Sequence, residues 1–186
     1  RFDPLYLKYE ADKKIPRSTV SAMQLFTEIL KERAETGRIY IMNVDHVNTH
    51  GSFREEVAPV RQSNLCCEIT TPTMPLQHID SSDPAISLCT LSAINWGKIR
   101  EPKDFEKPCR LAVRALDALL EHQEYPVPSA EENTRLFRNL GVGIINLAYW
   151  LAKNSTNYSN PDLDLIHEYA ESWSYYLIKA SVDLAE

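Results

Sequence analysis

The sequence predicts an α/β fold built on a largely parallel sheet or barrel. Apolar residues at helical spacing alternate along the chain with short apolar runs of strand length. The 186 residues are 44% hydrophobic and 25% charged, a balance typical of a globular domain with a sizeable core. The chain has no internal repeat and no low-complexity tract that would indicate another architecture.

A polar, proline-containing opening precedes the first predicted helix. Ser18 can cap this helix and Gly37 can end it. Apolar residues recur between them at helical spacing, namely Val20, Met23, Phe26, Ile29 and Leu30. Residues 39–42 are a β-branched and aromatic run, which predicts a short buried strand. Residues 43–50 contain two histidines that would suit a metal on a helix, but their Asn and Asp content favours a loop.

The central stretch of the chain contains a group of residues suited to chemistry. In an extended backbone alternate side chains share a face, so Asn64, Cys66 and Glu68 are expected to project together. They would offer one small substrate a hydrogen-bonding amide, a redox-active or nucleophilic sulfur and a proton acceptor. Packing is the competing interpretation, because cysteine is among the most often buried residue types.

A second thiol segment is expected to return beside the first. Residues 72–84 are rich in proline and turn residues, which predicts a surface loop. That loop would bring the segment around Cys89 next to the segment around Cys66. Residues 86–94 have the apolar density of a buried strand, so the residues alone predict that Cys89 packs in the core.

The second half of the chain contains two strongly marked helices. The first includes Cys109, which is predicted to be structural. Its apolar stripe comprises Phe105, Leu111, Ala112, Ala115, Leu116, Leu119 and Leu120. The second is predicted to begin with Asn160 as its cap and Pro161 at its first position. Its apolar face comprises Ile166, Tyr169, Ala170, Trp173, Leu177, Ala180 and Leu184.

The stretch between these helices is less clearly marked. After two prolines, residues 129–138 predict a charged connection. Residues 140–151 are the most apolar part of the chain, and Gly141 and Gly143 at their start resemble a phosphate loop. The third glycine of that motif is missing and no clear strand precedes it. A close backbone approach that leads into a buried helix is the better prediction.

Charge and cysteine spacing exclude several classes of function. The formal net charge of −6 lacks the clustered Lys and Arg that phosphate-backbone binding needs, so no nucleic-acid partner is expected. The four cysteines at positions 66, 67, 89 and 109 match no zinc-site spacing, so no metal is predicted. The sequence shows neither a long apolar span nor a signal-like start, so we expect a cytoplasmic protein with reduced thiols and no membrane association.

Several separated motifs resemble the large, catalytic subunit of class I ribonucleotide reductases. The resemblance is carried by APVRQSNLCCEI at residues 58–69 and SLCTLSAIN at residues 87–95. Residues 36–46, 111–117 and 139–143 look like the same family, and the motifs follow family order and spacing along nearly the whole chain.

The resemblance implies a ten-stranded α/β barrel with a finger loop that carries the active thiol at its tip. Residues 1–186 would then be a partial catalytic barrel domain, without the N-terminal regulatory domain, the start and end of the barrel, or the C-terminal tail. The first residue is not Met, which agrees with a piece of a longer chain. The complete protein would be a nucleotide-binding, ATP-binding allosteric oxidoreductase of deoxyribonucleotide biosynthesis for DNA replication.

The resemblance also implies roles for four residues. Cys66 would become a thiyl radical and abstract the ribose 3′-hydrogen. Glu68 would take the proton of the 3′-hydroxyl, and Asn64 would hydrogen-bond the substrate and that carboxylate. Cys89 would be one of two redox-active cysteines that end as a disulfide, while its partner in the family stands upstream and has no counterpart here. Cys67 stands where a larger aliphatic residue is common, and we interpret it as packing.

The implied partners are those of the family. The substrate would be a ribonucleoside diphosphate, a small metallo-subunit would generate the radical, and thioredoxin or glutaredoxin would be the reductant. The complete subunit would form a homodimer, and this segment itself would bind no cofactor or metal. We expect no activity from the 186 residues alone. The alternative function is a non-catalytic α/β binding or scaffold module with structural cysteines.

Overall fold

The structure is a computed structural model that describes residues 2–186, with side chains from residue 4 onward. The chain divides into two compact units, residues 1–41 and residues 42–186. The first unit contains two helices, α1 (Phe2–Ala11) and α2 (Ala22–Thr36). All the residues that the sequence places in the candidate site belong to the second unit.

Helix α2 confirms the first predicted helix but begins later than expected. Its N-cap is Ser21, whose side chain accepts a hydrogen bond from the backbone N–H of Gln24, and not Ser18. Gly37 ends the helix as predicted, with a φ of 65° that suits glycine. Its apolar stripe is not buried within this unit, since Met23 is 80% exposed. Helix α1 lies in the opening for which the sequence predicted no element.

The predicted strand at residues 39–42 is wrong. These residues have no regular secondary structure, and Tyr40 is 57% exposed. A strand needs a neighbour to satisfy its backbone N–H and C=O groups, and among residues 2–186 no segment pairs with this run. High β propensity alone was therefore not enough to form the strand.

The second unit contains a parallel two-stranded sheet, as the sequence predicted. Strand β1 (Leu91–Asn95) pairs with β2 (Gly141–Ile145), and Ala93 lies opposite Gly143. Strand β1 is shorter than the predicted run at residues 86–94. A Cβ atom added to Gly141 would lie 2.3 Å from Leu91 Cδ2, which confirms the predicted close approach. The glycines nevertheless belong to a strand that the sequence did not predict.

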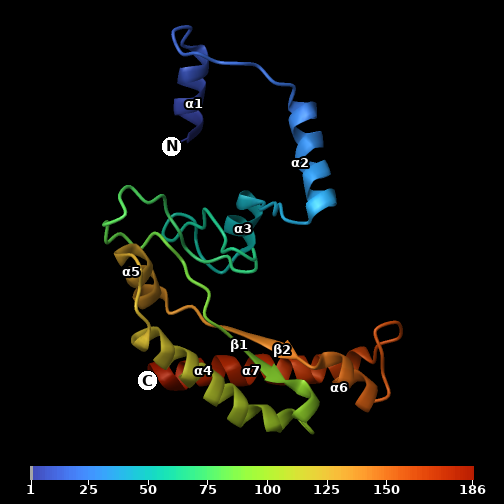
Figure 1. The fold of residues 1–186 in the computed structure, drawn as a ribbon. Helices are drawn as coiled ribbons and strands as arrows, with labels where there is room; N and C mark the ends of the chain where they lie inside the picture. The colour runs from blue at the N-terminus through green and yellow to red at the C-terminus, as the bar shows by residue number, and fades with distance from the viewer. Residues whose placement is uncertain (1) are drawn as a thin grey trace. The chain divides into compact units, whose positions relative to one another are not determined.

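The second unit also contains five helices. They are α3 (Val44–His50), α4 (Glu106–His122), α5 (Pro128–Phe137), α6 (Leu147–Lys153) and α7 (Leu163–Ala185). Of these, α4 and α7 run alongside the two strands (Figure 1). Short 3-10 turns occupy Trp96–Lys98 and Pro102–Phe105. Helices α4 and α5 form the connection that returns the chain from β1 to the parallel β2. Among residues 2–186, no helix has both the length and the apolar character needed to cross a membrane.

Two of these helices, α3 and α5, occupy residues that were predicted to be loops, and α7 has a different N-cap from the predicted one. Residues 44–50 form α3, and the side chain of Asn48 connects this helix to Val60 by hydrogen bonds with both the N–H and the C=O of Val60. Residues 129–138 belong largely to α5, whose buried face is polar and so lacks the apolar stripe that signals a helix. Helix α7 is capped by Asp162 and not by Asn160, since the Asp162 carboxylate accepts from Leu165 N–H at 3.1 Å.

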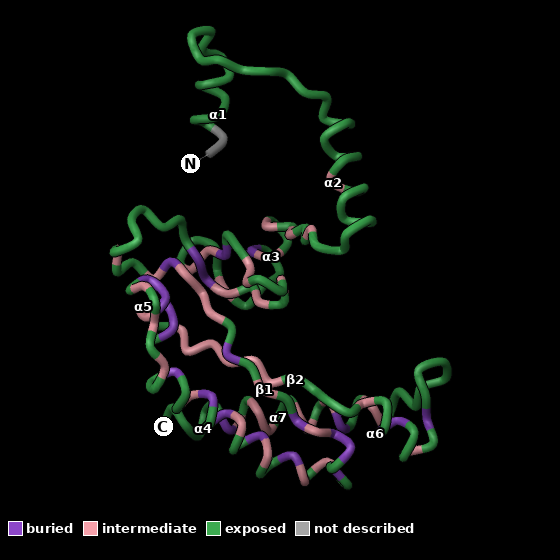
Figure 2. Tube along the Cα trace, viewed as in Figure 1, coloured by how far each residue is buried: buried purple, intermediate pink, exposed green. Residues whose placement is uncertain are grey.

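The core of this unit is a cluster of aromatic side chains between β1, α4, α6 and α7. Trp150 contacts Trp96 and Tyr169 with ring centroids 5.2 Å and 4.8 Å apart. Aromatic side chains bury more apolar surface than any others, so this cluster contributes heavily to stability. Buried residues are concentrated along α4, α5 and the chain that follows β1 (Figure 2). The apolar face predicted for α7 packs largely against this cluster, whereas the face predicted for α4 is only partly buried, since Leu111 and Leu119 are about half exposed.

Cys109 is completely buried in this core, as the sequence predicted. Its pKa is raised to about 11 by burial, so it stays a neutral thiol. Replacing Cys109 by serine would bury a hydroxyl among aromatic rings, and we expect a loss of about 1–3 kcal/mol of unfolding free energy. Urea unfolding of the complete protein checks this value. The half-buried Cys67→Ser variant is the control and should lose less.

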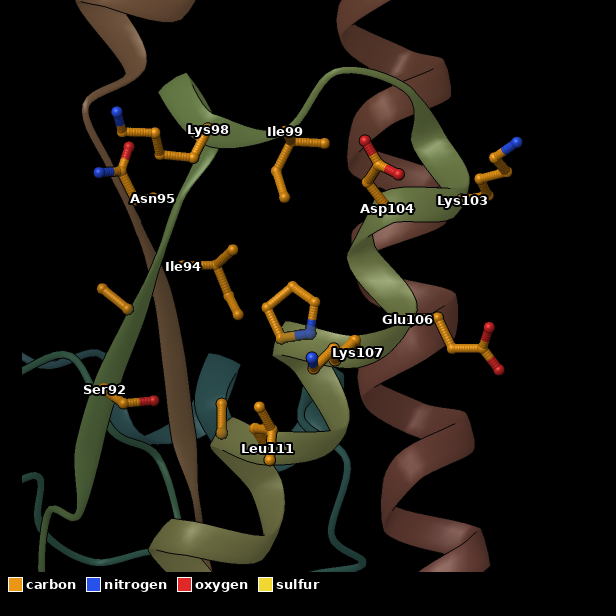
Figure 3. Close-up of a pocket in the computed structure, with 13 residues that line it drawn as sticks. Ser92, Ile94, Asn95, Lys98, Ile99, Lys103, Asp104, Glu106, Lys107 and Leu111 are labelled. Atoms are coloured by element: carbon orange, nitrogen blue, oxygen red, sulfur yellow. The ribbon is translucent and has the colours of Figure 1, made fainter.

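A hollow of about 680 Å³ lies between β1 and the first turns of α4 (Figure 3). Ser92, Ile94 and Asn95 line it from the strand, and Lys107 and Leu111 line it from the helix. None of the four residues predicted for the candidate site takes part in its lining. The hollow is therefore separate from that site.

Candidate active site

Cys66 lies in a tight reverse turn and not in an extended segment. The N–H of Cys67 donates to the carbonyl oxygen of Asn64 at 3.0 Å, and Cys67 has a left-handed φ of 60°. The turn exposes Cys66 and leaves Leu65 90% exposed. The prediction that side chains alternate along a strand is therefore wrong, because the backbone reverses direction at this point.

The same turn brings Asn64 and Glu68 together. Asn64 Nδ2 donates to Glu68 Oε1 at 2.6 Å. Asn64 Oδ1 accepts from the backbone N–H groups of Glu68 and Ile69, at 3.2 Å and 3.1 Å. The Asn64 side chain thus bridges the turn and orients the carboxylate at the same time. The predicted proximity of Asn64 and Glu68 is confirmed, although the turn and not strand alternation produces it.

Cys89 completes the group from the second segment. Its Sγ donates to Glu68 Oε1 at 3.0 Å, so one carboxylate oxygen receives both the amide of Asn64 and the thiol of Cys89. The predicted return of this segment beside the first is therefore confirmed. The prediction that Cys89 packs in the core is wrong, because β1 begins only at Leu91 and Cys89 remains exposed before it.

The proton positions in this group follow from its electrostatics. Partial desolvation of the sulfur raises the pKa of Cys89 to about 11, although the residue as a whole is exposed. The hydrogen bond to Glu68 and the charges of Glu68 and Cys66 act in the same direction. The hydrogen bond from Cys89 lowers the pKa of Glu68. At neutral pH the group therefore holds a carboxylate that accepts protons and a thiol that retains its hydrogen.

The Cys89 thiol is expected to react slowly with an alkylating agent. With a pKa of about 11, only about 1% of the thiol is ionised at pH 9, where a thiol of the ordinary pKa is half ionised. Glu68→Gln removes the negative charge but leaves the desolvation of the sulfur, so the pKa should fall part of the way to its ordinary value and the alkylation rate at pH 9 should rise about fivefold or more. Mass spectrometry of the Cys89 peptide measures this rate. An unchanged rate would contradict the contact between Cys89 and Glu68.

Two polar residues that the sequence did not single out hold the first segment in place. Thr73 Oγ1 accepts from the backbone N–H groups of Arg61 and Gln62, at 2.9 Å and 3.0 Å. Asn48 of α3 pairs with the backbone of Val60 through two bonds of 2.8 Å. A threonine and an asparagine in apparent loops are common in any sequence, so only their buried positions identify these roles.

The donor set is not that of a metal centre. Within the described residues, no group of three or more His, Cys, Asp or Glu side chains could hold a metal ion. The four cysteines are all free of disulfide bonds. A cavity of about 280 Å³ lies beside Asn64, where Ser63 and Ile69 face Ser87 of the second segment. The group therefore consists of a thiol-bearing turn, a carboxylate, an amide and a second thiol next to a small cavity.

Comparison with known proteins decides the family. The sequence model described as "Ribonucleotide reductase, barrel domain" matches residues 1–186. The chain belongs to this ribonucleotide reductase family. The resemblance of residues 58–69 and 87–95 to ribonucleotide reductases is thereby confirmed. Residues 2–186 contain two parallel strands within a mixed α/β unit, and they do not by themselves show a ten-stranded barrel or a finger loop.

Curated ribonucleotide reductase subunits align with the whole chain. The ribonucleoside-diphosphate reductase subunit alpha of Haemophilus influenzae is 54% identical over 187 residues, which cover 100% of this chain and 25% of the relative. The ribonucleoside-diphosphate reductase 1 subunit alpha of Escherichia coli is 50% identical and the subunit alpha of Enterobacteria phage T4 is 44% identical, each covered to 24%. The chain thus spans about a quarter of the length of these reductase subunits.

Proposed function

We propose that this chain is part of the catalytic barrel of a class I ribonucleotide reductase large subunit. The complete subunit would reduce ribonucleoside diphosphates to 2′-deoxyribonucleoside diphosphates, and the turn at residues 64–67 would form the tip of a finger loop in a ten-stranded barrel. The observation that supports this most is the shared Glu68 Oε1, which receives Asn64 and Cys89 directly beside the turn that carries Cys66.

The proposed reaction assigns one step to each residue. A thiyl radical on Cys66 takes the ribose 3′-hydrogen, while the Glu68 carboxylate accepts the proton of the 3′-hydroxyl. Asn64 orients that carboxylate and the substrate, and the 2′-hydroxyl leaves as water. The hydrogen taken by Cys66 returns to C3′ at the end and restores the thiyl radical.

The two electrons come from a pair of thiols. Cys89 and a second cysteine from another part of the complete subunit are oxidised to a disulfide, and the C2′–O bond of the substrate is reduced. The balance is one ribonucleotide and two thiols in, and one deoxyribonucleotide, one disulfide and one water out. The raised pKa of Cys89 suits this role, because a thiol that keeps its proton can supply a hydrogen.

The proposal also includes the partners of such a subunit. A small metallo-subunit would supply the radical, and a dithiol protein such as thioredoxin or glutaredoxin would reduce the disulfide after each turnover. The complete large subunit would work as a homodimer in the cytoplasm under the control of ATP and other nucleotides. These parts follow from the family, whereas the reacting group follows from the geometry at Glu68.

The scaffold alternative receives less support from the structure. It assigns packing roles to the thiols, but of the four cysteines only Cys109 is buried, and Cys66 and Cys89 are exposed. A structural thiol gains nothing from exposure beside a carboxylate, whereas a reacting thiol needs access to its substrate.

Product formation by the complete subunit tests the proposal. With the radical-generating subunit and a dithiol present, a ribonucleoside diphosphate should become its deoxy form, and deuterium at C3′ should slow the reaction. Omission of the radical-generating subunit should stop it. A complete subunit that binds nucleotides but forms no deoxyribonucleotide under any of these conditions would support the scaffold alternative.

A further inference from the structure

The segments that carry Glu68 and Cys89 run side by side in opposite directions. Glu68 contacts Cys89, the hydroxyls of Thr71 and Ser87 meet, and Met74 N–H donates to Ala85 C=O at 3.2 Å. From one contact to the next, the first segment advances by three residues and the second runs back by two. The segments nevertheless form no regular β ladder, so something else must keep them in register.

Asn133 of α5 links the two segments at the end away from the candidate site. Its Nδ2 donates to the carbonyl oxygen of Pro72 at 2.9 Å and to that of Pro84 at 3.0 Å. Pro72 follows Glu68 by four residues and Pro84 precedes Cys89 by five. Both hydrogens of one planar amide are used, one on each segment, so the distance between the two carbonyls is set by a rigid group.

Helix α5 is itself held firmly, so it can act as a fixed support. Ser129, one turn before Asn133, donates to the carbonyl oxygen of Ser81 at 2.6 Å in the loop that joins the segments. Arg138 at the end of α5 donates to Asp117 of α4 at 2.8 Å and to Glu121 at 2.5 Å. The support for the two segments is therefore anchored to the helix that packs on the aromatic core.

The burial of Asn133 indicates that its amide has a specific role. The residue is only 1% exposed, and its Oδ1 has no hydrogen-bond partner within the described residues. A buried amide with one unsatisfied oxygen loses part of the stability that its two donor bonds contribute. Stability alone therefore does not explain an asparagine at this position. The alignment of the two segments by its two N–H donors explains it better.

We propose that Asn133 is a positioning residue that holds the Glu68 and Cys89 segments in the register that places thiol against carboxylate. Its importance for nucleotide reduction rests on the function proposed above, but its effect on the contact between Cys89 and Glu68 does not. Without the two donor bonds, the segments can shift along each other, and the thiol then separates from the carboxylate.

Two variants of the complete subunit test this role. They are complementary, because the first can bury a charge and the second can keep one of the two donor bonds. Asn133→Asp keeps the shape and removes both donors, and Asn133→Ser buries no charge but can reach only one carbonyl. Thr134→Val is the matched control, because the neighbouring Thr134 is buried and its hydroxyl has no partner within residues 2–186. Thermal unfolding identifies which variants fold.

Alkylation of Cys89 at pH 9 is the first measurement, and it requires no catalysis. We expect the rate to rise at least about fivefold in a folded Asn133 variant, as the thiol loses the carboxylate, and to stay within about twofold of wild type in Thr134→Val. The second measurement is steady-state reduction, in which kcat should fall by about 100-fold while KM changes little, because reacting groups are misplaced and substrate contacts are kept.

Each outcome decides the role of Asn133. A folded Asn133 variant with wild-type alkylation of Cys89 overturns it, and so does failure of both variants to fold while Thr134→Val folds, since Asn133 would then serve stability alone. Faster alkylation in a complete subunit whose wild type shows no reductase activity would support the alignment and reject the proposed function. The two claims therefore fail separately.

Discussion

Replacing Cys66 by serine in the complete subunit is expected to lower the rate of deoxyribonucleotide formation by at least about 1000-fold. The O–H bond of an alcohol is stronger than the S–H bond of a thiol. The radical therefore cannot be formed on serine, and no group at this position can abstract hydrogen from the ribose. Cys66 is exposed at a turn and has no packing role to lose, so folding and nucleotide binding should not change. Product formation and substrate binding are measured on the same preparation.

The neighbouring cysteine provides a matched control for this variant. Cys67→Ser makes the same change of atom one residue away, at a half-buried position whose left-handed backbone serine tolerates as well as cysteine. We expect its rate to stay within about twofold of wild type. Equal loss in both variants would indicate that the turn, and not the Cys66 sulfur, is sensitive to substitution. Normal turnover by Cys66→Ser would reject the proposed function.

Replacing Glu68 by glutamine should slow reduction by about 100- to 10,000-fold, the range typical of a lost general base. Glutamine keeps the length of the side chain and can still accept the hydrogen bond that Asn64 now makes at 2.6 Å. It cannot accept the proton of the substrate hydroxyl, so the loss should appear in kcat with little change in KM. Steady-state kinetics separate the two parameters.

Glu55→Gln is the control for the loss of a carboxylate in this region. Glu55 pairs with Arg61 at 2.9 Å, and both side chains are about half exposed, so the pair contributes little to stability. Activity of Glu55→Gln should stay within about twofold of wild type. A Glu68→Gln variant that retains wild-type kcat would show that another group accepts the proton.

The pH dependence of Glu68 follows from its lowered pKa. The hydrogen bond from Cys89 stabilises the carboxylate form of Glu68. In the folded protein this carboxylate is therefore protonated only below its ordinary pKa of 4.5. The contribution of this contact to stability is complete above pH 4.5 and is lost as the pH falls through the lowered value. Loss of activity at mildly acidic pH should therefore come from groups other than Glu68.

The sequence predicted the elements whose signals come from an apolar face. Both predicted helices α4 and α7 form and pack on the aromatic core, and Cys109 is buried there as predicted, although Leu111 and Leu119 of the predicted α4 stripe are about half exposed. The parallel pairing of β1 and β2 also agrees with the predicted class. These features follow from burial of apolar surface, which a sequence records as periodicity.

The features that the sequence did not predict depend on contacts between distant polar groups. Helix α5 buries Ser129 and Asn133 against backbone carbonyls of a loop. Because these residues are polar, the sequence wrongly indicates that the buried face of the helix is exposed to solvent. Residues 39–42 show the opposite error, because their apolar run has no partner strand within residues 2–186. Neither outcome can be derived from local residue types.

Three of the residues predicted for the candidate site, Asn64, Glu68 and Cys89, lie in contact, but the geometry predicted for them was wrong. Asn64 and Glu68 meet because the chain turns at residues 64–67. Two hydrogen bonds that Asn64 Oδ1 accepts from the backbone N–H groups of Glu68 and Ile69 stabilise that turn. Cys89 is exposed because the strand begins at Leu91, two residues after Cys89, and not at residue 86 as the apolar run suggests. The family resemblance supplied Cys89 as a redox residue, whereas the residues alone indicated a packed thiol.

The thiol state of each cysteine after one round of reaction tests the assigned roles most directly. The complete subunit is mixed with its radical-generating partner and substrate in the absence of any external dithiol, and the cysteine peptides are then analysed by mass spectrometry. We predict Cys89 in a disulfide and Cys66 as a free thiol, with one deoxyribonucleotide for each disulfide formed. Deoxyribonucleotide formed with Cys89 still reduced, or with Cys66 in the disulfide, would contradict the account.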